Sequence, residues 1–372
     1  MITSTDFFNQ IEAVLHSNHP FVLFSKPGQT SVKSYMQLDS ESYAINDFSE
    51  SGFVFAPFDH QKERYYIPTD KSSFIELESA EFEISPPTNP SNNTEDSSHH
   101  LDLVYKAIKE IKSSELEKVV VSSAFQFELE TCSPIETFKN LFQKYPTAFT
   151  YCWFHPETGF WLGASPEILL KLEGKLVSTM SLAGTKPYQA IKEIEWDEKN
   201  HTEHAFVTDY LLDVLKAYLD GIKLIGPRTL RAGQLLHLQT IITGRLKHSK
   251  EALKDLIHAL HPTPAVCGTS RTMALDFINS NETYDREYYT GFFGELNIPE
   301  TFVFRNSKKN IENRAYQTIR KSTNLAVNLR CMKLISSTAI LYSGGGITKD
   351  SIPKQEYIEI PVSYTHLRAH ET

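Results

Sequence analysis

The chain has 372 residues, of which 40% are hydrophobic and 12% aromatic, enough for a sizeable core in one large or two ordinary domains. A net charge of -9 argues against nucleic acid or an anionic membrane as a partner, but an acidic protein can still carry a basic site for an anionic substrate. The four cysteines form no CxxC pair, and we find neither a basic start followed by an apolar run nor an apolar stretch long enough to span a membrane. We therefore expect a cytoplasmic protein with reduced thiols.

The first hundred residues predict one helix and several short strands. Apolar side chains recur at helical spacing over residues 7–18. Strands are predicted at Phe21–Ser25, Gly52–Pro57 and Tyr65–Pro68, with turn residues between them. Residues 85–100 are rich in Pro, Ser and Asn and predict a flexible surface connection. This connection is the best candidate boundary in the chain, and it separates either two domains or two halves of one.

The rest of the chain mixes helices and strands. Helices are predicted over residues 101–112, 197–221 and 251–259. Strands are predicted at Lys118–Phe127, Ala148–Phe154, Gly159–Leu162, Thr301–Arg305, Leu325–Leu329 and Lys333–Tyr342, and a glycine turn over residues 343–346 ends the last of them. These elements lack regular βαβ alternation, so we expect an α+β fold rather than a doubly wound parallel sheet.

Two residues are candidates for acid–base chemistry. Lys118 begins a very apolar strand, where an exposed lysine is the commoner arrangement, whereas a base near pH 7 requires a buried and neutral amine. Glu167 follows a turn in the segment GASPE, residues 163–167. It either caps a backbone amide or, in apolar surroundings, has a raised pKa and donates a proton.

Several charged residues further along the chain are candidates for binding. Glu203 and His204 are neighbours on a predicted helix, so they do not share a face and a two-ligand zinc site is disfavoured. Arg330 ends an apolar strand, where arginine is rare unless it is paired. Glu356 and Glu359 lie on one face if their segment is helical, and a solvated helix face is the alternative.

Separated segments, ordered along the chain, resemble the signature motifs of chorismate-utilising enzymes and, within them, of isochorismate synthases. The most informative is HPTPAVCG at residues 261–268, followed by DREYYTG at residues 285–291. The others include KVVVSS at residues 118–123, GASPE at 163–167, SLAGT at 181–185, KNHTEH at 199–204 and YSGGGIT at 342–348. Together these matches are far more specific than any one of them alone.

The resemblance covers nearly all of the chain after the predicted connection. It implies one α+β domain of two stacked, mainly antiparallel sheets flanked by helices, as in anthranilate synthase component I, with the site between the sheets. Residues 1–100 are then the N-terminal part of this fold, and residues 101–359 are its chorismate-binding region. Residues 360–372 leave the family pattern, so we expect an atypical tail that is not native family sequence.

The resemblance also implies a role for each candidate residue. Lys118 is implied to be the base that deprotonates the attacking water, and Glu167 the general acid. Glu203 and Glu359 are implied to bind Mg²⁺, with Glu356 in support. The implied substrate-binding residues are Ala183, Gly184, Thr185, His261, Tyr289, Arg330, Gly344 and Gly346.

Some of these implied roles have an alternative explanation. His261 is implied to position the substrate ring, but it could equally be a core histidine that makes one hydrogen bond. Tyr289 is implied to contact the enolpyruvyl group and Arg330 to fork onto a substrate carboxylate. Gly344 and Gly346 are implied to offer backbone N–H groups to the same carboxylate, and a plain glycine turn is the alternative.

Three positions depart from related patterns. Ala183 stands where aminodeoxychorismate synthases often have a lysine nucleophile, which disfavours that branch because alanine forms no covalent adduct. Ser123 replaces an arginine in the lysine motif, and Ser363 replaces a lysine that binds a carboxylate in the family. With Ser363 and the tail as written, we expect weaker substrate binding and lower stability than in a full-length relative.

The function implied is Mg²⁺-dependent, reversible isomerisation of chorismate to isochorismate, by water addition at C2 and loss of the C4 hydroxyl. The pathway is that of menaquinone or of a siderophore, and a monomer without a glutaminase subunit is expected. A salicylate synthase, which goes on to expel pyruvate, is the nearest alternative, and an amine transfer like that of anthranilate synthase is a weaker one. A chorismate-binding protein without turnover is the alternative from a different class.

Overall fold

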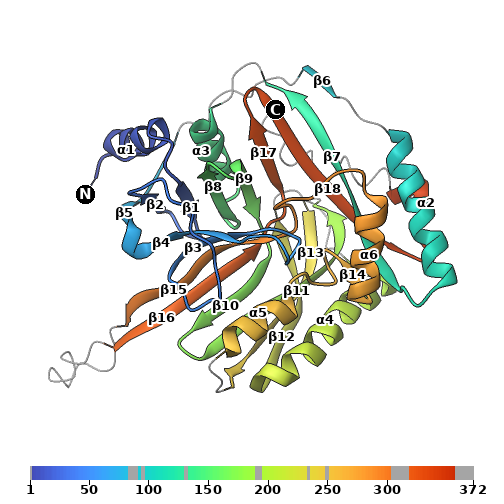
Figure 1. The fold of residues 1–372 in the computed structure, drawn as a ribbon. Coiled ribbons are helices and arrows are strands. Elements are labelled where there is room, and N and C mark those ends of the chain that lie inside the picture. The colour runs from blue at the N-terminus through green and yellow to red at the C-terminus, as the bar shows by residue number, and fades with distance from the viewer. Residues whose placement is uncertain are drawn as a thin grey trace.

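Two antiparallel sheets face each other in this computed structural model, and helices cover their outer faces (Figure 1). The structure describes residues 2–82, 91–93, 97–129, 133–188, 195–232, 235–247, 251–302 and 318–356. The two sheets share one aromatic core, so these residues form a single domain. The expected α+β fold of two mainly antiparallel sheets is confirmed.

The first sheet has the strand order β14-β7-β18-β17-β9-β8-β1-β2-β5, with β6 pairing to β7 beside this path. Its strands are β1 (Phe21–Ser25), β2 (Val32–Gln37), β5 (Ser72–Leu77), β6 (Ser91–Asn93), β7 (Lys118–Glu128), β8 (Phe149–His155), β9 (Gly159–Ser165), β14 (Gly268–Thr269), β17 (Cys331–Ile335) and β18 (Thr338–Thr348). The pairing of β7 with β18 extends from Lys118–Thr348 to Glu128–Thr338. Residues of this long ladder line the large cavity described below.

The second sheet has the strand order β12-β13-β11-β10-β16-β15-β3-β4. Its strands are β3 (Gly52–Ala56), β4 (Tyr65–Pro68), β10 (Ile168–Glu173), β11 (Leu176–Pro187), β12 (Leu219–Ala232), β13 (Leu235–Leu246), β15 (Phe292–Phe302) and β16 (Thr318–Val327). Strands β3 and β4 come from the N-terminal quarter of the chain; β3 pairs with β15, and β4 pairs with β3. The segment before the predicted connection is therefore built into the same sheet as the segment after it.

The helices are α1 (Ser4–His16), α2 (Ser97–Ser113), α3 (Pro134–Lys144), α4 (Glu198–Tyr218), α5 (Ala252–Leu260) and α6 (Arg271–Asn281), with a 3-10 turn η1 (Thr69–Lys71). Short polar side chains cap several of them. Thr3 accepts a hydrogen bond from the Asp6 N–H before α1, and Asp197 accepts one from the Asn200 N–H at 2.9 Å before α4. These caps explain why the helices begin where they do.

The alternation of side chains along β3 shows how the two sheets are covered. Phe53 and Phe55 point into the aromatic core between the sheets, whereas Val54 and Ala56 belong to the core under the helices. All four are buried, as expected for a strand that is covered on both faces. The Phe55 ring lies 5.0 Å from that of Trp153 in the opposite sheet.

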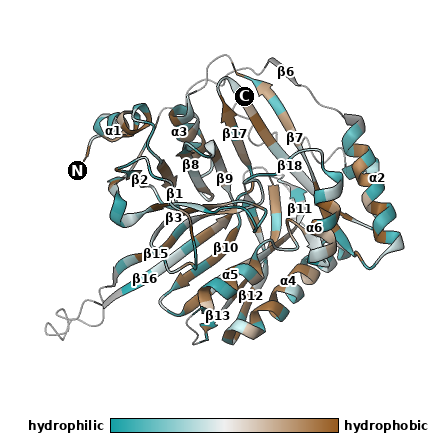
Figure 2. Ribbon diagram, in the orientation of Figure 1, coloured by the Kyte–Doolittle hydropathy of each residue, from teal (hydrophilic) through white to brown (hydrophobic). Residues whose placement is uncertain are grey.

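Three pairs of helices cover the outer faces of the sheets. Helices α1 and α3 pack on the β1–β9 end of the first sheet. Helices α2 and α6 pack beside β7 and β18 of the same sheet. The remaining pair, α4 and α5, covers the second sheet. In Figure 2 hydrophobic and hydrophilic segments alternate along these helices, as expected when only one side of a helix is buried. Among the described helices, none combines the length and the apolarity needed to cross a membrane.

The structure corrects two predictions near the end of the chain. The strand predicted at Lys333–Tyr342 is a hairpin of β17 and β18, which reverses at Ser336 in the left-handed region with φ 53°. The glycines of residues 343–346 form no turn but continue β18 to Thr348. Pairing with the full length of β7 overrides the low strand preference of glycine.

The predicted connection at residues 85–100 is partly structured. Residues 83–90 and 94–96 lie outside the described residues, but β6 pairs with β7 and α2 begins at Ser97 rather than at residue 101. His100 of this first helical turn is buried, and its Nδ1 lies 2.7 Å from the hydroxyl of Ser123. The serine that replaces the family arginine thus has a local partner.

Replacing Phe55 with alanine is expected to lower the free energy of unfolding by about 3–5 kcal/mol, because this fully buried ring joins the two sheets. Phe74 on the edge strand β5 is 48% exposed, so Phe74→Ala is the matched control with a clearly smaller loss. Urea denaturation measures both variants. Equal losses would contradict the packing of the two sheets on one another.

Candidate active site

One large cavity brings most of the candidate residues together. It has a volume of about 1750 Å³ and is bordered by β7, β11, β13, β18 and α4. Its wall includes the candidates Lys118, Glu167, Ala183, Gly184, Glu203, Tyr289, Arg330, Gly344, Gly346 and Glu356. Thus residues that are more than 200 positions apart in the sequence meet at one end of the two sheets.

Lys118, the first residue of β7, is a buried lysine. It is only 7% exposed, and its Nζ lies 3.7 Å from Oε1 of Glu203 on α4. A Cβ atom at Gly346 of β18 would lie 2.6 Å from Lys118 Cε, so a side chain there would displace the lysine from its present position across the neighbouring strand. The alternative of an exposed lysine at a strand end does not hold.

Glu167 lies between β9 and β10 and is buried. Its backbone is fixed on both sides, because its N–H donates to Ser165 Oγ and its carbonyl accepts from the Val327 N–H. Burial raises the pKa of Glu167 from an ordinary 4.5 to about 7, and the positive charge of Lys118 opposes this shift. The carboxyl group is therefore able to hold a proton near neutral pH.

Glu203 and Glu356 place two carboxylates on the cavity wall. The Glu203 side chain is 41% exposed, and Glu356 Oε2 would lie 3.9 Å from a Cβ atom at Gly345. His204 points away from the cavity, is buried, and its Nε2 lies 2.8 Å from Thr240 Oγ1, as expected for neighbours on opposite faces of a helix.

Residues 357–372 are outside the described part of the chain. They include Glu359, Ser363 and the atypical tail, whose predicted roles stay predictions. Among the described residues, no group of three or more His, Cys, Asp or Glu side chains is arranged to hold a metal ion.

Arg330 occupies the sharp connection between β16 and β17, with φ 50°. Its carbonyl accepts a hydrogen bond from the Ala164 N–H at 3.2 Å, and a Cβ atom at Gly163 would lie 3.1 Å from that carbonyl. The glycine of GASPE therefore lets the Arg330 turn approach β9. Burial lowers the pKa of Arg330 to about 10, which still leaves the guanidinium charged at neutral pH.

The SLAGT segment forms a β-bulge in β11. The register against β13 shifts between Ala183 and Thr185, and Gly184 has φ 74°. The Gly184 carbonyl lies 3.1 Å from Nδ1 of His237, and Nε2 of the same histidine lies 3.2 Å from Nη2 of Arg330. Thr185 pairs with His237 along the ladder, and its side chain is outside the described set. The sequence analysis missed His237, although a histidine within the apolar run LLHL was a possible signal.

Tyr289 is buried on the cavity wall. It stacks on Tyr342 with ring centroids 5.2 Å apart, and burial raises its pKa. A Cβ atom at Gly344 would lie 3.0 Å from the Tyr289 hydroxyl. Because β17 pairs with β18 only up to Leu341, the glycine strand beyond it has no described partner on its edge facing away from β7. This edge is where its backbone N–H groups could meet a ligand.

His261 does not reach the cavity. Its Nε2 donates to the Pro57 carbonyl at 3.2 Å, its ring lies 5.0 Å from that of Phe292, and burial lowers its pKa to about 3. His261 is thus a buried histidine that is not among the residues lining the cavity, and its implied place near the substrate ring stays a prediction.

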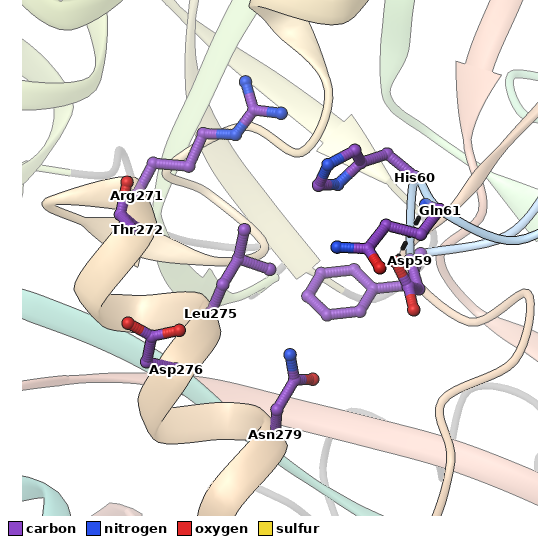
Figure 3. A pocket seen from close by; sticks show the side chains of 9 residues that line it. Asp59, His60, Gln61, Arg271, Thr272, Leu275, Asp276 and Asn279 are labelled. Carbon is purple, nitrogen blue, oxygen red and sulfur yellow. Dashed lines mark hydrogen bonds between the residues drawn. The ribbon is translucent and has the colours of Figure 1, made fainter.

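A smaller cavity of about 360 Å³ lies between α6 and residues 58–61, and Figure 3 shows it. Its labelled side chains include Asp59, Arg271 and Asn279. The Arg271 guanidinium donates to the backbone carbonyls of His258 and His261, so it fixes the end of α5. None of the candidate residues lines this cavity.

Comparison with known sequences supports the family suggested by the motifs. A family model described as chorismate binding enzyme matches residues 57–302, more than half of the chain. The isochorismate synthase MenF of Escherichia coli is 30% identical over 278 residues, which cover 72% of this chain and 58% of that protein. Anthranilate synthase component 1 of Methanothermobacter marburgensis is 25% identical over 273 residues, 70% of this chain and 54% of that protein. The chain therefore matches somewhat more than half the length of these relatives.

Solved structures show the same fold. The 2,3-dihydroxybenzoate-specific isochorismate synthase DhbC of Bacillus anthracis superposes with a TM-score of 0.77 at 22% identity, covering 96% of this chain and 98% of that one. The menaquinone-specific isochorismate synthase MenF of Escherichia coli gives a TM-score of 0.76 at 20% identity, with 95% and 89% covered. With the family model matching across Lys118, Glu167, Glu203 and Tyr289, the chain belongs to the chorismate-binding enzyme family.

Proposed function

We propose that this chain is an isochorismate synthase, an isomerase that interconverts chorismate and isochorismate. One observation carries the proposal: a buried lysine and a buried glutamate, whose pKa is raised to about 7, line the same cavity. The relation to isochorismate synthases such as MenF of Escherichia coli supports it.

The proposed reaction requires one base, which accepts a proton, and one acid, which donates a proton. Water is a poor nucleophile, so Lys118, in its neutral amine form, accepts a proton as water adds to C2 of the substrate ring. Hydroxide is a poor leaving group, so Glu167 donates a proton to the departing C4 hydroxyl. As the C2–O bond forms and the C4–O bond breaks, both ring double bonds shift, from C1=C2 to C1=C6 and from C5=C6 to C4=C5. Each group is then ready to act in the reverse direction.

The cavity also supplies charge for an anionic substrate. Arg330 presents a guanidinium to one carboxylate, and the exposed edge of Gly344 and Gly346 presents backbone N–H groups to it. Tyr289 offers a ring and a hydroxyl beside them. A local basic site of this kind is compatible with the net charge of -9.

Magnesium fits the chemistry of the donors in this cavity. Glu203 and Glu356 supply carboxylate oxygens, and Mg²⁺ is commonly held by one or two carboxylates while it keeps several waters. In our proposal Glu203 and Glu359 hold the ion, with Glu356 in support. When bound, the ion would neutralise the ring carboxylate of the substrate.

The proposal stops at the reaction and does not choose a pathway. The related proteins include menaquinone-specific and siderophore-type isochorismate synthases. We further propose a cytoplasmic monomer that needs no glutaminase subunit, because the proposed nucleophile is water rather than ammonia.

Product analysis separates the alternatives. Incubation with chorismate and Mg²⁺ is expected to yield isochorismate without pyruvate. Stoichiometric release of pyruvate would identify a salicylate synthase. If titration calorimetry shows that chorismate binds and no product forms, the protein is a binding protein without turnover.

Lys118→Ala is expected to lower kcat by about 10²–10⁴-fold while chorismate still binds, because a general base typically contributes that much. Lys349→Ala is the matched control, since Lys349 lines the same cavity but is exposed. Steady-state kinetics and calorimetric binding measure both. A Lys118→Ala variant with nearly normal turnover would remove the base from the mechanism.

Glu167 makes stability depend on pH in a direction that can be worked out. The folded chain holds this proton up to about pH 7, whereas the unfolded chain loses it near 4.5, so stability falls as pH rises through this window. The difference corresponds to about 3 kcal/mol above pH 7. Glu167→Gln cannot ionise, so its free energy of unfolding relative to the parent is expected to rise by that amount from pH 4.5 to above 7.

Denaturation at several pH values measures this change, with Glu12→Gln at an exposed position of α1 as the control that shows no such trend. The kinetics provide a second readout, because activity that depends on a protonated Glu167 falls as pH rises above about 7. A pH-independent stability difference would refute the raised pKa.

Glu203→Gln is expected to raise the Mg²⁺ concentration needed for half-maximal activity and to lower turnover, because an amide is a weaker ligand than a carboxylate. Glu198→Gln is the control on the same helix and cavity wall. Kinetics over a range of Mg²⁺ concentrations give both quantities. Full activity of protein treated with EDTA would show that no metal is needed.

A further inference from the structure

We propose that His237, as its neutral Nδ1–H tautomer, is a positioning residue that orients the Arg330 guanidinium toward a carboxylate of the substrate. The identity of that substrate rests on the proposed function, whereas the arrangement of the side chains does not. His237 belongs to none of the motifs that resemble the family signature in our sequence analysis.

Two hydrogen bonds of the imidazole, with Arg330 and with Gly184, indicate its tautomer. Nε2 lies 3.2 Å from Nη2 of Arg330, and a guanidinium has only N–H donors, so Nε2 accepts. A neutral imidazole that accepts at Nε2 carries its proton on Nδ1. That proton meets the Gly184 carbonyl at 3.1 Å, which is an acceptor only. Both partners therefore favour the same tautomer.

The bulge at Gly184 explains why a carbonyl is available to His237. In a regular ladder the carbonyls of β11 are directed at neighbouring strands, but the register shift between Ala183 and Thr185 leaves the Gly184 peptide out of this pattern. Its φ of 74° favours glycine, and a Cβ atom there would lie 3.4 Å from that of Asn200 and 3.6 Å from the Trp196 ring. Gly184 thus allows the backbone conformation in which its carbonyl accepts from His237.

Arg330 benefits from a partner at its far end. Its backbone is held by the Ala164 N–H, but a long side chain retains several rotatable bonds beyond that point. An acceptor for one Nη2 proton restricts the rotation of the guanidinium, which has five N–H donors in a fixed plane. The neutral acceptor does so without the charge neutralisation that a carboxylate in this position would cause.

Replacement by two amides separates the two contacts of His237. In His237→Gln the amide oxygen reaches the position of Nε2 and can accept from Arg330, whereas in His237→Asn the shorter amide reaches only the position of Nδ1. We expect His237→Asn to raise KM for chorismate about tenfold to hundredfold with little change in kcat. His237→Gln should stay within a few-fold of the parent protein.

A double-mutant cycle tests whether His237 acts through Arg330. Adding His237→Asn to Arg330→Ala is expected to raise KM no further, because the guanidinium to be oriented is gone. Additive effects in this cycle, or equal effects of the asparagine and glutamine variants, would overturn the proposal. Melting temperatures report whether each variant is folded.

A readout without substrate keeps this inference separate from the proposed function. Nitrogen NMR of protein with labelled histidine, assigned with His237→Gln, is expected to show His237 as the Nδ1–H tautomer at neutral pH in the free protein. An Nε2–H tautomer or a charged imidazole would refute the positioning role even in an active enzyme. If instead the tautomer is as expected and chorismate is not converted, only the proposed function fails.

Discussion

A buried ion pair between Glu282 and Arg286 holds together the segments on which the site is built. Both side chains are 2% exposed, and Arg286 also donates to the carbonyls of Val120 on β7 and Val266 in the HPTPAVCG segment. The Glu282 carboxylate accepts from the N–H and the hydroxyl of Ser122. The pair thus joins the end of α6 to the strand that carries Lys118. Removing one partner of such a pair leaves an uncompensated buried charge, which typically costs about 3–5 kcal/mol.

With β7 held in this way, strand pairing and the absence of side chains at two glycines position the acid–base site. The β7–β18 ladder places Gly346 where the Lys118 side chain must pass, and Gly163 lets the Arg330 turn approach β9. Burial leaves Glu167 able to hold a proton near neutral pH, and Lys118 lies 3.7 Å from the carboxylate of Glu203. The fold determines where the side chains lie, and burial away from water raises the pKa of Glu167.

Much of the fold was predictable because the signals were local. The short β-like run Phe21–Ser25 and its flanking turn residues predict that strand with its observed bounds, and the apolar run after Lys118 predicts β7. Strands β10–β13 and helices α3 and α6 were not predicted, because their hydrophobic pattern alone does not separate strand from helix. The glycines of residues 343–346 predict a turn, and the structure differs because they pair with β7 residues more than 200 positions away. The contact between His237 and Arg330 is not predictable from local sequence either, because long-range packing of β13 against the β16–β17 connection creates it.

The central claim is that a carboxyl group on the cavity wall holds its proton near neutral pH before any substrate binds. Infrared difference spectroscopy of the free protein against Glu167→Gln measures this directly, because a protonated carboxyl has a C=O stretch that a carboxylate lacks. We predict that this band is present at pH 5 and is lost with a midpoint at about 7. A band that is lost with a midpoint near the ordinary value of 4.5 would contradict the assignment of Glu167 as the proton donor.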